Sequence, residues 1–259
     1  MDYNVLLLTR NDCYKAKRKM KPKGIVVHST GANNTSLKRY IGPNDGRIGR
    51  NAHNNHWNQP GISKCVHAFI GYDDNKVVCT YQTLPLDICA WGVGKGSKGT
   101  YNYEPAYLQF EILEDNLKSK TYFNKVMKEA QELCAKWCKE FDIPVSKVIS
   151  HKEAHTKGYG SNHTDCDHWL SKFGKDMKWF RAEVTKILNN EIQVGDKVKI
   201  QNNVSAYYDG KKLPAWVKKS TFYARRKETK NGVPVWLIST HKTLPIYTGR
   251  VKAKDIIKI

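Results

Sequence analysis

The stretch Gly24-Ile25-Val26-Val27-His28-Ser29-Thr30-Gly31 decides how the first part of this chain is interpreted. Its apolar half is among the longest apolar runs in the sequence, and a short uninterrupted run is typical of a buried strand. The run stops at His28, which is followed by small polar residues. Because a sheet fixes the backbone where a strand ends, a side chain there is held firmly and faces a cleft. His28 is therefore a candidate metal ligand, although a single histidine at a strand end is more often structural.

A second apolar strand also stops at a histidine. Val148–Ser150 leads into His151, and a stretch rich in histidine, aspartate and cysteine follows shortly after it. A catalytic zinc ion takes three nitrogen, oxygen or sulfur ligands from the protein and keeps one position for water. His28 and His151 predict two of these ligands, and Asp165 or Cys166 supplies the third. Four further histidines are interpreted as structural or surface residues: His53, His56, His155 and His168.

Glu111 is a candidate proton carrier because it interrupts the mostly apolar stretch Tyr107–Leu113. A glutamate at this position lies either on a solvent-exposed face or in a cleft. Hydrolysis by metal-activated water needs a carboxylate that moves protons. The residue types therefore allow a zinc hydrolase with Glu111 as its acid/base, and they equally allow a set of structural residues.

Strands alternate with helices over the first 190 residues. Apolar runs predict strands at 24–28, 66–71, 76–81, 107–113 and 148–150. Apolar residues at helical spacing predict helices over 121–141 and 174–190. This alternation predicts an α/β or α+β domain in which helices flank one central sheet.

The pattern changes after residue 190. Apolar residues then alternate at period two, and turn residues at Asp209-Gly210, Asn231-Gly232 and Thr248-Gly249 separate the alternating stretches. About five short strands without a helix predict a small all-β barrel. We therefore predict two domains, covering residues 1–190 and 191–259.

The charge of the chain is strongly positive. It holds 44 lysines and arginines against 24 aspartates and glutamates, a formal net charge of +20. Residues 192–259 hold 15 of the former and 4 of the latter, so a quarter of the chain carries more than half of the net charge. This balance favours an anionic partner: nucleic acid, acidic lipid or an anionic cell-wall polymer.

Other classes of protein are disfavoured by the same composition. No apolar run approaches the roughly 20 residues that a membrane span needs. No secretory signal is recognised, because the apolar Val5–Leu8 precedes the basic residues instead of following them. The seven cysteines form an odd, irregularly spaced set, so we expect reduced thiols.

Most of residues 10–181 resembles the phage and clostridial branch of the type 2 N-acetylmuramoyl-L-alanine amidases. The matching stretches are Asn11–Tyr14, His28–Asn34, Arg39-Tyr40, Asn55–Asn58 and Ser161–Asp165. The resemblance implies a mixed sheet flanked by helices, and a Zn²⁺-dependent enzyme that cuts the amide bond between muramic acid and L-alanine in peptidoglycan. It also implies the zinc ligands, which are His28, His151 and Asp165. Glu111 matches the glutamate that acts as acid/base.

Three departures from the family pattern affect the site. His163 stands where many relatives have a lysine that stabilises the oxyanion, and it offers the same hydrogen bond when suitably protonated. Cys166 replaces the usual proline and remains a competing ligand, with His155 as a secondary candidate. The stretch Ala90–Gly94 reads Ala-Trp-Gly-Val-Gly and lacks the histidine that relatives have there, so no substrate role of that histidine carries over.

Residues 191–259 resemble, more loosely, a bacterial SH3-like cell-wall-binding domain, with Trp216, Tyr207 and Tyr223 as substrate-binding residues. The resemblance implies an endolysin that is made in the host cytoplasm without a signal peptide and acts at the cell wall after release. Its implied partners are the peptidoglycan of a Gram-positive wall and the anionic polymers of that wall. No nucleic acid and no membrane span are expected.

Three other functions stay open at this point. A bacterial autolysin would have the same activity, although autolysins usually carry an export signal. A non-catalytic peptidoglycan-recognition protein on the same fold characteristically lacks a zinc ligand, whereas all three are present here. The third alternative is single-stranded nucleic acid on the basic C-terminal barrel.

Overall fold

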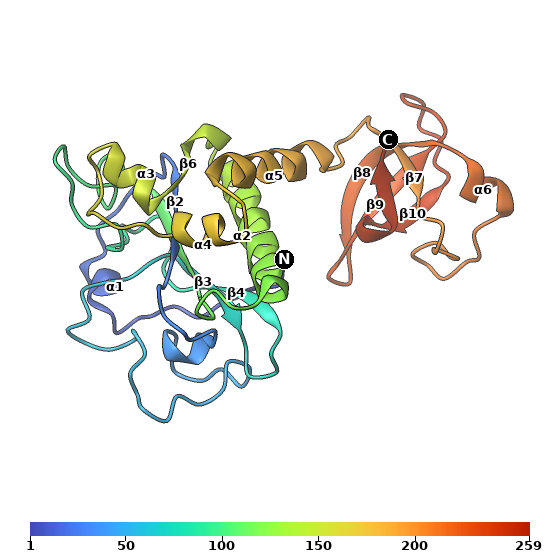
Figure 1. Ribbon diagram of the computed structural model, residues 1–259. Helices are drawn as coiled ribbons and strands as arrows, with labels where there is room; N and C mark the ends of the chain where they lie inside the picture. The colour runs from blue at the N-terminus through green and yellow to red at the C-terminus, as the bar shows by residue number, and fades with distance from the viewer. The chain divides into compact units, whose positions relative to one another are not determined.

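The computed structural model describes residues 1–259, and the chain divides into two compact units, Met1–Leu188 and Asn189–Ile259 (Figure 1). The first unit is built on a six-stranded sheet in the order β1-β4-β3-β5-β2-β6. β3 and β4 pair antiparallel and the other four pairings are parallel, so the predicted mixed sheet is confirmed. The strands are β1 (Tyr3–Val5), β2 (Ile25–Ser29), β3 (Ala68–Tyr72), β4 (Val78–Gln82), β5 (Leu108–Ile112) and β6 (Val148–Ser150).

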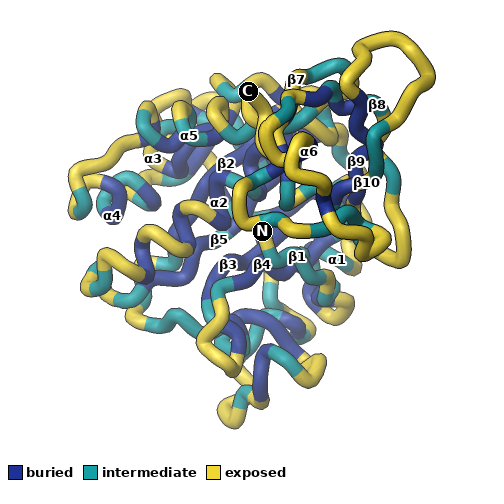
Figure 2. Tube along the Cα trace, turned by 90° about the vertical axis from the view of Figure 1, so that its right-hand side faces the viewer, coloured by how far each residue is buried: buried dark blue, intermediate teal, exposed yellow.

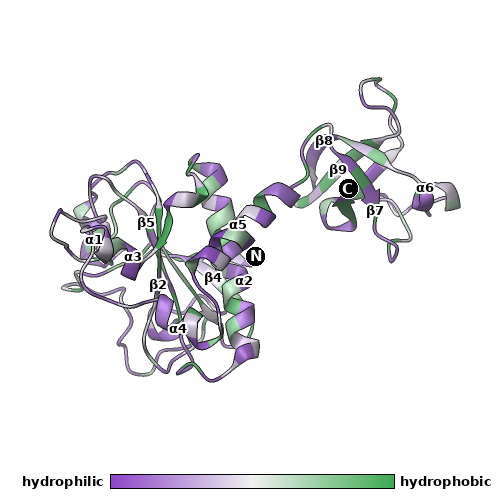
Figure 3. Cartoon of the chain, turned by 45° about the horizontal axis from the view of Figure 1, so that its top comes forward, coloured by the Kyte–Doolittle hydropathy of each residue, from purple (hydrophilic) through white to green (hydrophobic).

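Five helices accompany this sheet. The two long ones occur where helical spacing predicted them, and Figure 3 shows hydrophobic and hydrophilic residues alternating along α2. α2 begins after Ser119, whose side-chain oxygen accepts a hydrogen bond from the backbone N–H of Tyr122 (3.1 Å). The helices are α1 (Asp12–Ala16), α2 (Lys120–Glu140), α3 (His151–Thr156), α4 (Asp167–Lys172) and α5 (Met177–Asn190), with short 3-10 turns at Leu37–Arg39 and Val145–Lys147.

β2 is buried on both of its faces, which explains its uninterrupted apolar run (Figure 2). Ile25 and Val27 pack with α2, α4 and α5 on one side of the sheet. Val26 packs on the opposite side, against Tyr107 and loop residues. Because side chains alternate along a strand, His28 projects to the same side as Val26, away from α2.

The second unit holds a five-stranded antiparallel sheet in the order β10-β9-β8-β7-β11. A 3-10 turn of three residues, Ala253–Asp255, joins β10 at one edge to β11 at the other, so the sheet curls enough to bring its edges close together. The prediction that this region contains strands only was wrong, because Ala215–Lys219 forms the short helix α6 after Pro214. The strands are β7 (Lys197–Ile200), β8 (Phe222–Lys230), β9 (Val233–Ser239), β10 (Gly249–Lys252) and β11 (Ile256–Lys258).

The structure also bears on the expected state of the cysteines and on membrane-spanning helices. All seven cysteines are free and buried, as expected of reduced structural thiols. None of the helices combines the length and the apolar character that crossing a membrane requires.

His67 is a buried histidine that ties the central strands together. Its Nε2 contacts the carbonyl oxygen of Ile88 (2.9 Å), and its Nδ1 accepts from the backbone N–H of Gln109 (3.0 Å). Burial lowers the pKa of His67 to about 4. The folded chain therefore keeps this imidazole neutral at pH values where an exposed histidine is protonated.

Acidification should destabilise the protein through His67. Between pH 6.5 and pH 4 the unfolded chain binds a proton that the folded chain does not, so the free energy of unfolding falls as the pH falls. We expect a loss of about 2 kcal/mol from this residue between pH 7 and pH 5, measured by urea denaturation. His67→Gln should lack this part of the slope, and the exposed His53→Gln should keep it. The same slope in His67→Gln and wild type would contradict the prediction.

Candidate active site

Three parallel strands deliver the candidate residues to one edge of the sheet. β2 pairs in parallel with β5 on one side and with β6 on the other. In this register His28 lies beside Glu111, and Val27 lies beside Ser150, the residue before His151. The carboxyl ends of parallel strands meet at the same edge of a sheet, so the side chains of His28, Glu111 and His151 reach one region. Open α/β sheets bind their ligands at this edge.

His151 is fixed by the start of α3. The side chain of Ser150 accepts from the backbone N–H of Glu153 (3.1 Å), and the Glu153 carboxylate accepts from the backbone N–H of Ser150 (3.2 Å). This reciprocal capping box ends β6 and begins the helix at His151. Arg181 of α5 holds the same carboxylate at 2.8 and 3.1 Å. The direction of the His151 side chain is thus set by strand, cap and neighbouring helix together.

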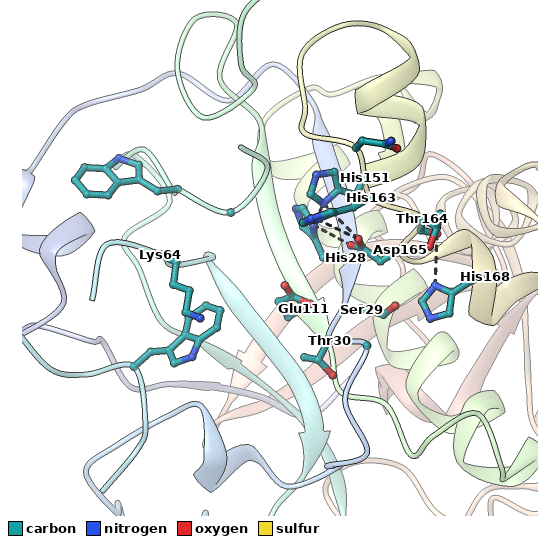
Figure 4. A pocket seen from close by; sticks show the side chains of 15 residues that line it. His28, Ser29, Thr30, Lys64, Glu111, His151, His163, Thr164, Asp165 and His168 are labelled. Atoms are coloured by element: carbon teal, nitrogen blue, oxygen red, sulfur yellow. Dashed lines mark hydrogen bonds and ion pairs between the residues drawn. The ribbon is translucent and has the colours of Figure 1, made fainter. Parts of the chain in front are cut away.

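His28, His151 and Asp165 converge on a single point (Figure 4). The Nδ1 atoms of the two histidines are 3.0 Å apart, and the Asp165 carboxylate oxygens lie 3.2 Å from His28 Nδ1 and 3.4 Å from His151 Nδ1. Ligand atoms about 2.0–2.1 Å from a tetrahedral zinc ion lie roughly 3.3–3.4 Å from one another. The 3.2 Å distance involves Oδ2 of Asp165, and the 3.4 Å distance involves Oδ1. The three predicted ligands therefore lie close enough together to share one zinc ion.

The protonation states of this cluster also suit a metal. Burial lowers the pKa of His28, although contact with Asp165 opposes the shift. Burial alone would raise the pKa of Asp165, but hydrogen bonds from His151 and His28 outweigh it and hold that pKa well below its usual range. A neutral imidazole and an ionised carboxylate are the forms that bind metal ions.

Glu111 lies next to this cluster on β5. Its Oε2 atom is enclosed and has no hydrogen-bond partner. Burial raises the pKa of Glu111 well above its usual value, and the carboxylates of Asp165 and Glu114 add to this effect. A carboxyl group in such surroundings accepts and releases protons closer to neutral pH than an exposed one does.

These residues line a cavity of about 680 Å³. His163 stands at its mouth, with 60% of its side chain exposed, and its ring centre lies 4.6 Å from that of His151. The His163 Nδ1 is 3.9 Å from the Asp165 carboxylate. Asn162 and Thr164 also line this cavity and belong to the matching stretch Ser161–Asp165, although no role was assigned to them. Lys64 lines it too, and sequence reasoning missed it because it lies in a loop without an informative pattern.

The remaining candidates lie outside the cluster. Cys166 packs in the core with its Sγ 3.9 Å from the sulfur of Met177, so it does not face the point where His28, His151 and Asp165 converge. His155 Nδ1 contacts the carbonyl oxygen of Gly160 (3.2 Å). His168 was interpreted as a structural or surface residue, and it pairs at the cavity wall with the buried Glu114 (3.1 Å).

Residues 18–168 match the family model described as N-acetylmuramoyl-L-alanine amidase, and this range contains the whole cluster and Glu111. The chain belongs to this amidase family. A curated relative, the N-acetylmuramoyl-L-alanine amidase CwlH of Bacillus subtilis (strain 168), is 33% identical over 112 residues. That alignment covers 43% of this chain and 40% of the relative, so the match spans well under half of either protein.

Solved structures of similar proteins match the amidase region as well. A variant of PlyL is 20% identical with a TM-score of 0.49, and the match covers 71% of this chain and 99% of that one. The hydrolase AmiA of Staphylococcus aureus, solved in complex with its ligand, is 16% identical with a TM-score of 0.48, covering 72% and 82%. Membership of the amidase family rests on the match over residues 18–168 and not on these two structures.

The three-residue cluster should bind one metal ion. We expect purified wild type to hold about one equivalent of zinc, and His28→Ala, His151→Ala and Asp165→Asn each to lose it, since a catalytic site provides only three protein ligands. Elemental analysis after dialysis measures the content. His155→Ala is the matched control and should retain zinc. A loss of zinc in that control, or its retention in all three ligand variants, would contradict the assignment.

Proposed function

We propose that residues 1–190 form a zinc-dependent N-acetylmuramoyl-L-alanine amidase, which hydrolyses the amide bond between the lactyl group of muramic acid and L-alanine in peptidoglycan. The observation that carries this proposal is the convergence of the side chains of His28, His151 and Asp165, with Glu111 beside them, in a chain of the amidase family. The match to CwlH covers only part of that protein, so its activity is carried over here as a proposal.

The proposed mechanism assigns one role to each group. His28, His151 and Asp165 would hold the zinc ion, which would supply the Lewis acidity that activates water and polarises the scissile carbonyl. Glu111 removes a proton from the attacking water and delivers it to the leaving L-alanine nitrogen. Its raised pKa suits both steps, because the carboxyl group must hold the proton between them.

His163 is proposed to stabilise the negative charge that develops on the carbonyl oxygen. Its position at the cavity mouth, against the ring of His151, supports this role. A protonated imidazole donates the hydrogen bond that the family's lysine provides. The exposure of His163 leaves its ring free to turn toward a bound substrate.

A non-catalytic recognition protein is the second candidate for this unit. Such relatives characteristically lack a zinc ligand, whereas this chain brings three donors together. The enclosed and unpartnered Glu111 also favours catalysis, since burying a carboxylate without a partner costs stability that a pure binding site does not require.

We propose that residues 191–259 form an SH3-like domain that binds the cell wall. Its curled antiparallel sheet and its excess of positive charge support this assignment. The unit has a cavity of about 420 Å³ that Tyr207 lines, but Trp216 and Tyr223 do not line it. Cationic side chains stand at the same cavity: Lys211, Lys230 and Arg250.

The Tyr207 cavity suits an anionic wall component. The Tyr207 ring packs closely against Gly249 of β10, where an added Cβ would lie 2.4 Å from its Cε1 atom. Arg250 pairs with Glu228 through Nε (3.0 Å), which leaves its terminal nitrogens without a protein partner. The Lys211 pair with Asp209 is exposed and 3.7 Å long, and such pairs contribute little. Lys230 also pairs with Glu228, at 3.8 Å, and its side chain stays exposed. The exposure of all three cations supports contact with a phosphate-rich wall polymer.

The whole chain is thus proposed to be an endolysin that acts on a Gram-positive wall after release from the cytoplasm in which it is made. An autolysin with the same activity is the alternative. Nucleic acid is not expected as a partner, although the charge alone permits it.

Replacing Glu111 by Gln should lower kcat about 10²- to 10⁴-fold without loss of zinc, because the proton carrier is removed while the ligands remain. Mass analysis of digested peptidoglycan measures the reaction. Wild type should produce new free L-alanine N-termini and no new reducing sugar ends. Glu104→Gln, an exposed glutamate in the loop before β5, is the control. New sugar ends, cuts within the stem peptide, or full activity of Glu111→Gln would overturn the proposal.

Wall retention should depend on the Tyr207 cavity. We expect Tyr207→Ala and Arg250→Ala to weaken binding to purified walls about fivefold to tenfold, as centrally placed contacts do. The Arg250 effect should shrink at high salt, which screens the attraction. Lys218→Ala removes the same charge outside the cavity and should leave retention nearly unchanged. Equal losses in Lys218→Ala and Arg250→Ala would show that net charge, and not this cavity, holds the wall.

A further inference from the structure

Several buried polar atoms near the proposed zinc site lack hydrogen-bond partners, and two of them lie on paired residues of β2 and β5 or next to such a pair. These two atoms are Nε2 of His28 and the side-chain oxygen Oε1 of Gln109. His28 is 1% exposed and Gln109 is fully enclosed. One of these atoms donates when protonated and the other accepts, so together they form a complementary pair. They come from neighbouring parallel strands, since β2 and β5 pair with Val26 beside Gln109 and His28 beside Glu111.

The orientation of the Gln109 amide is fixed by its other end. Asn102 Oδ1 accepts from the backbone N–H groups of Gly92 and Val93, each at 3.2 Å, so it must be the oxygen of that side chain. The same oxygen contacts the Gln109 amide nitrogen at 3.0 Å. Because Gln109 presents its N–H group to Asn102, its oxygen is left without a partner beside Gly92, and Gly92 and His28 line the same cavity.

Gly92 leaves the space that Gln109 fills. A Cβ on Gly92 would come within 2.6 Å of Gln109 Oε1 and 2.9 Å of Val66 Cγ1. Any larger side chain at position 92 would therefore displace the Gln109 amide. The glycine in the stretch Ala-Trp-Gly-Val-Gly, which departs from the family pattern, is thus matched to a glutamine on the neighbouring strand.

We propose that Gln109 is a positioning residue for the metal site: it accepts a hydrogen bond from Nε2 of His28 and so presents Nδ1 to zinc. A histidine ligand generally donates its second N–H to such an acceptor, which fixes its tautomer and its ring orientation. This inference rests on the zinc site proposed above.

His151 has a similar chain of contacts that leads to the same backbone segment, Gly92-Val93. Nε2 of His151 contacts the hydroxyl oxygen of Ser161 (3.2 Å), and that hydroxyl donates to the carbonyl of Val93 (3.2 Å). Val93 also donates its N–H to Asn102. The Gly92-Val93 backbone therefore supports both histidines, one through Asn102 and Gln109 and the other through Ser161.

The experiment compares zinc binding by the full-length chain and its variants. Gln109→Leu has a similar volume and no acceptor, and we expect its zinc affinity to fall about 10- to 100-fold in a chelator competition. Gln131→Leu is the matched control, because Gln131 is also a buried glutamine with an unpartnered amide nitrogen but lies on α2. Its zinc affinity should equal that of wild type.

A second variant keeps the proposal testable if Gln109→Leu folds poorly. Gly92→Ala should weaken zinc binding by pushing the Gln109 oxygen away, and adding it to Gln109→Leu should cause little further loss, since the displaced group is already gone. The absorption spectrum of the Co²⁺-loaded protein should change in Gln109→Leu and Gly92→Ala and stay unchanged in Gln131→Leu.

The outcomes separate this inference from the proposed function. If Gln109→Leu and Gly92→Ala bind zinc as tightly as wild type, the positioning role is wrong and the amidase proposal stands. If the losses of the two substitutions simply add, the coupling of Gly92 to Gln109 is wrong. If wild type binds no zinc, the proposed function fails and this inference fails with it.

Discussion

The parallel pairing of β2 between β5 and β6 is the constraint on which the site depends. Both faces of β2 are buried, so its register is set by packing on both sides of the sheet. A slip of one residue would turn His28 toward α2 and bring Val27 to the cavity side. The same register places Glu111 beside His28 and brings β6 to an end next to them. The hydrophobic core and the chemistry of the site therefore depend on one set of strand pairings.

This dependence explains why much of the first unit could be predicted from the sequence. A strand that is buried on both faces has a short run of apolar residues in its sequence. A long helix that covers a sheet has apolar residues at helical spacing. A histidine or glutamate that ends or interrupts such a run is therefore conspicuous, as His28 and Glu111 are. The short helices α1, α3 and α6 escaped prediction because caps and local turns determine them, and these leave little periodicity.

The parts that could not be predicted depend on contacts between distant segments. Asp165 and Cys166 are adjacent, and the sequence allowed either as a ligand; packing of Cys166 against Met177 removes it from the cluster. In the second unit, the curl of the sheet decides which aromatic residues share a cavity, and it selects Tyr207 without Trp216 or Tyr223. The spacing of residues along the chain therefore predicts neither the third ligand nor the aromatic residues that line this cavity.

The charge of the site explains why position 109 holds a glutamine amide instead of a carboxylate. Two imidazole ligands and one carboxylate ligand would leave a bound Zn²⁺ with a net charge of +1, which would preserve its ability to polarise a carbonyl. Asp165 and Glu114 already raise the pKa of Glu111. A third carboxylate at position 109, on the same face of β5, would add to that repulsion and weaken the pull of the metal on its substrate. A glutamine orients His28 by hydrogen bonding without either effect.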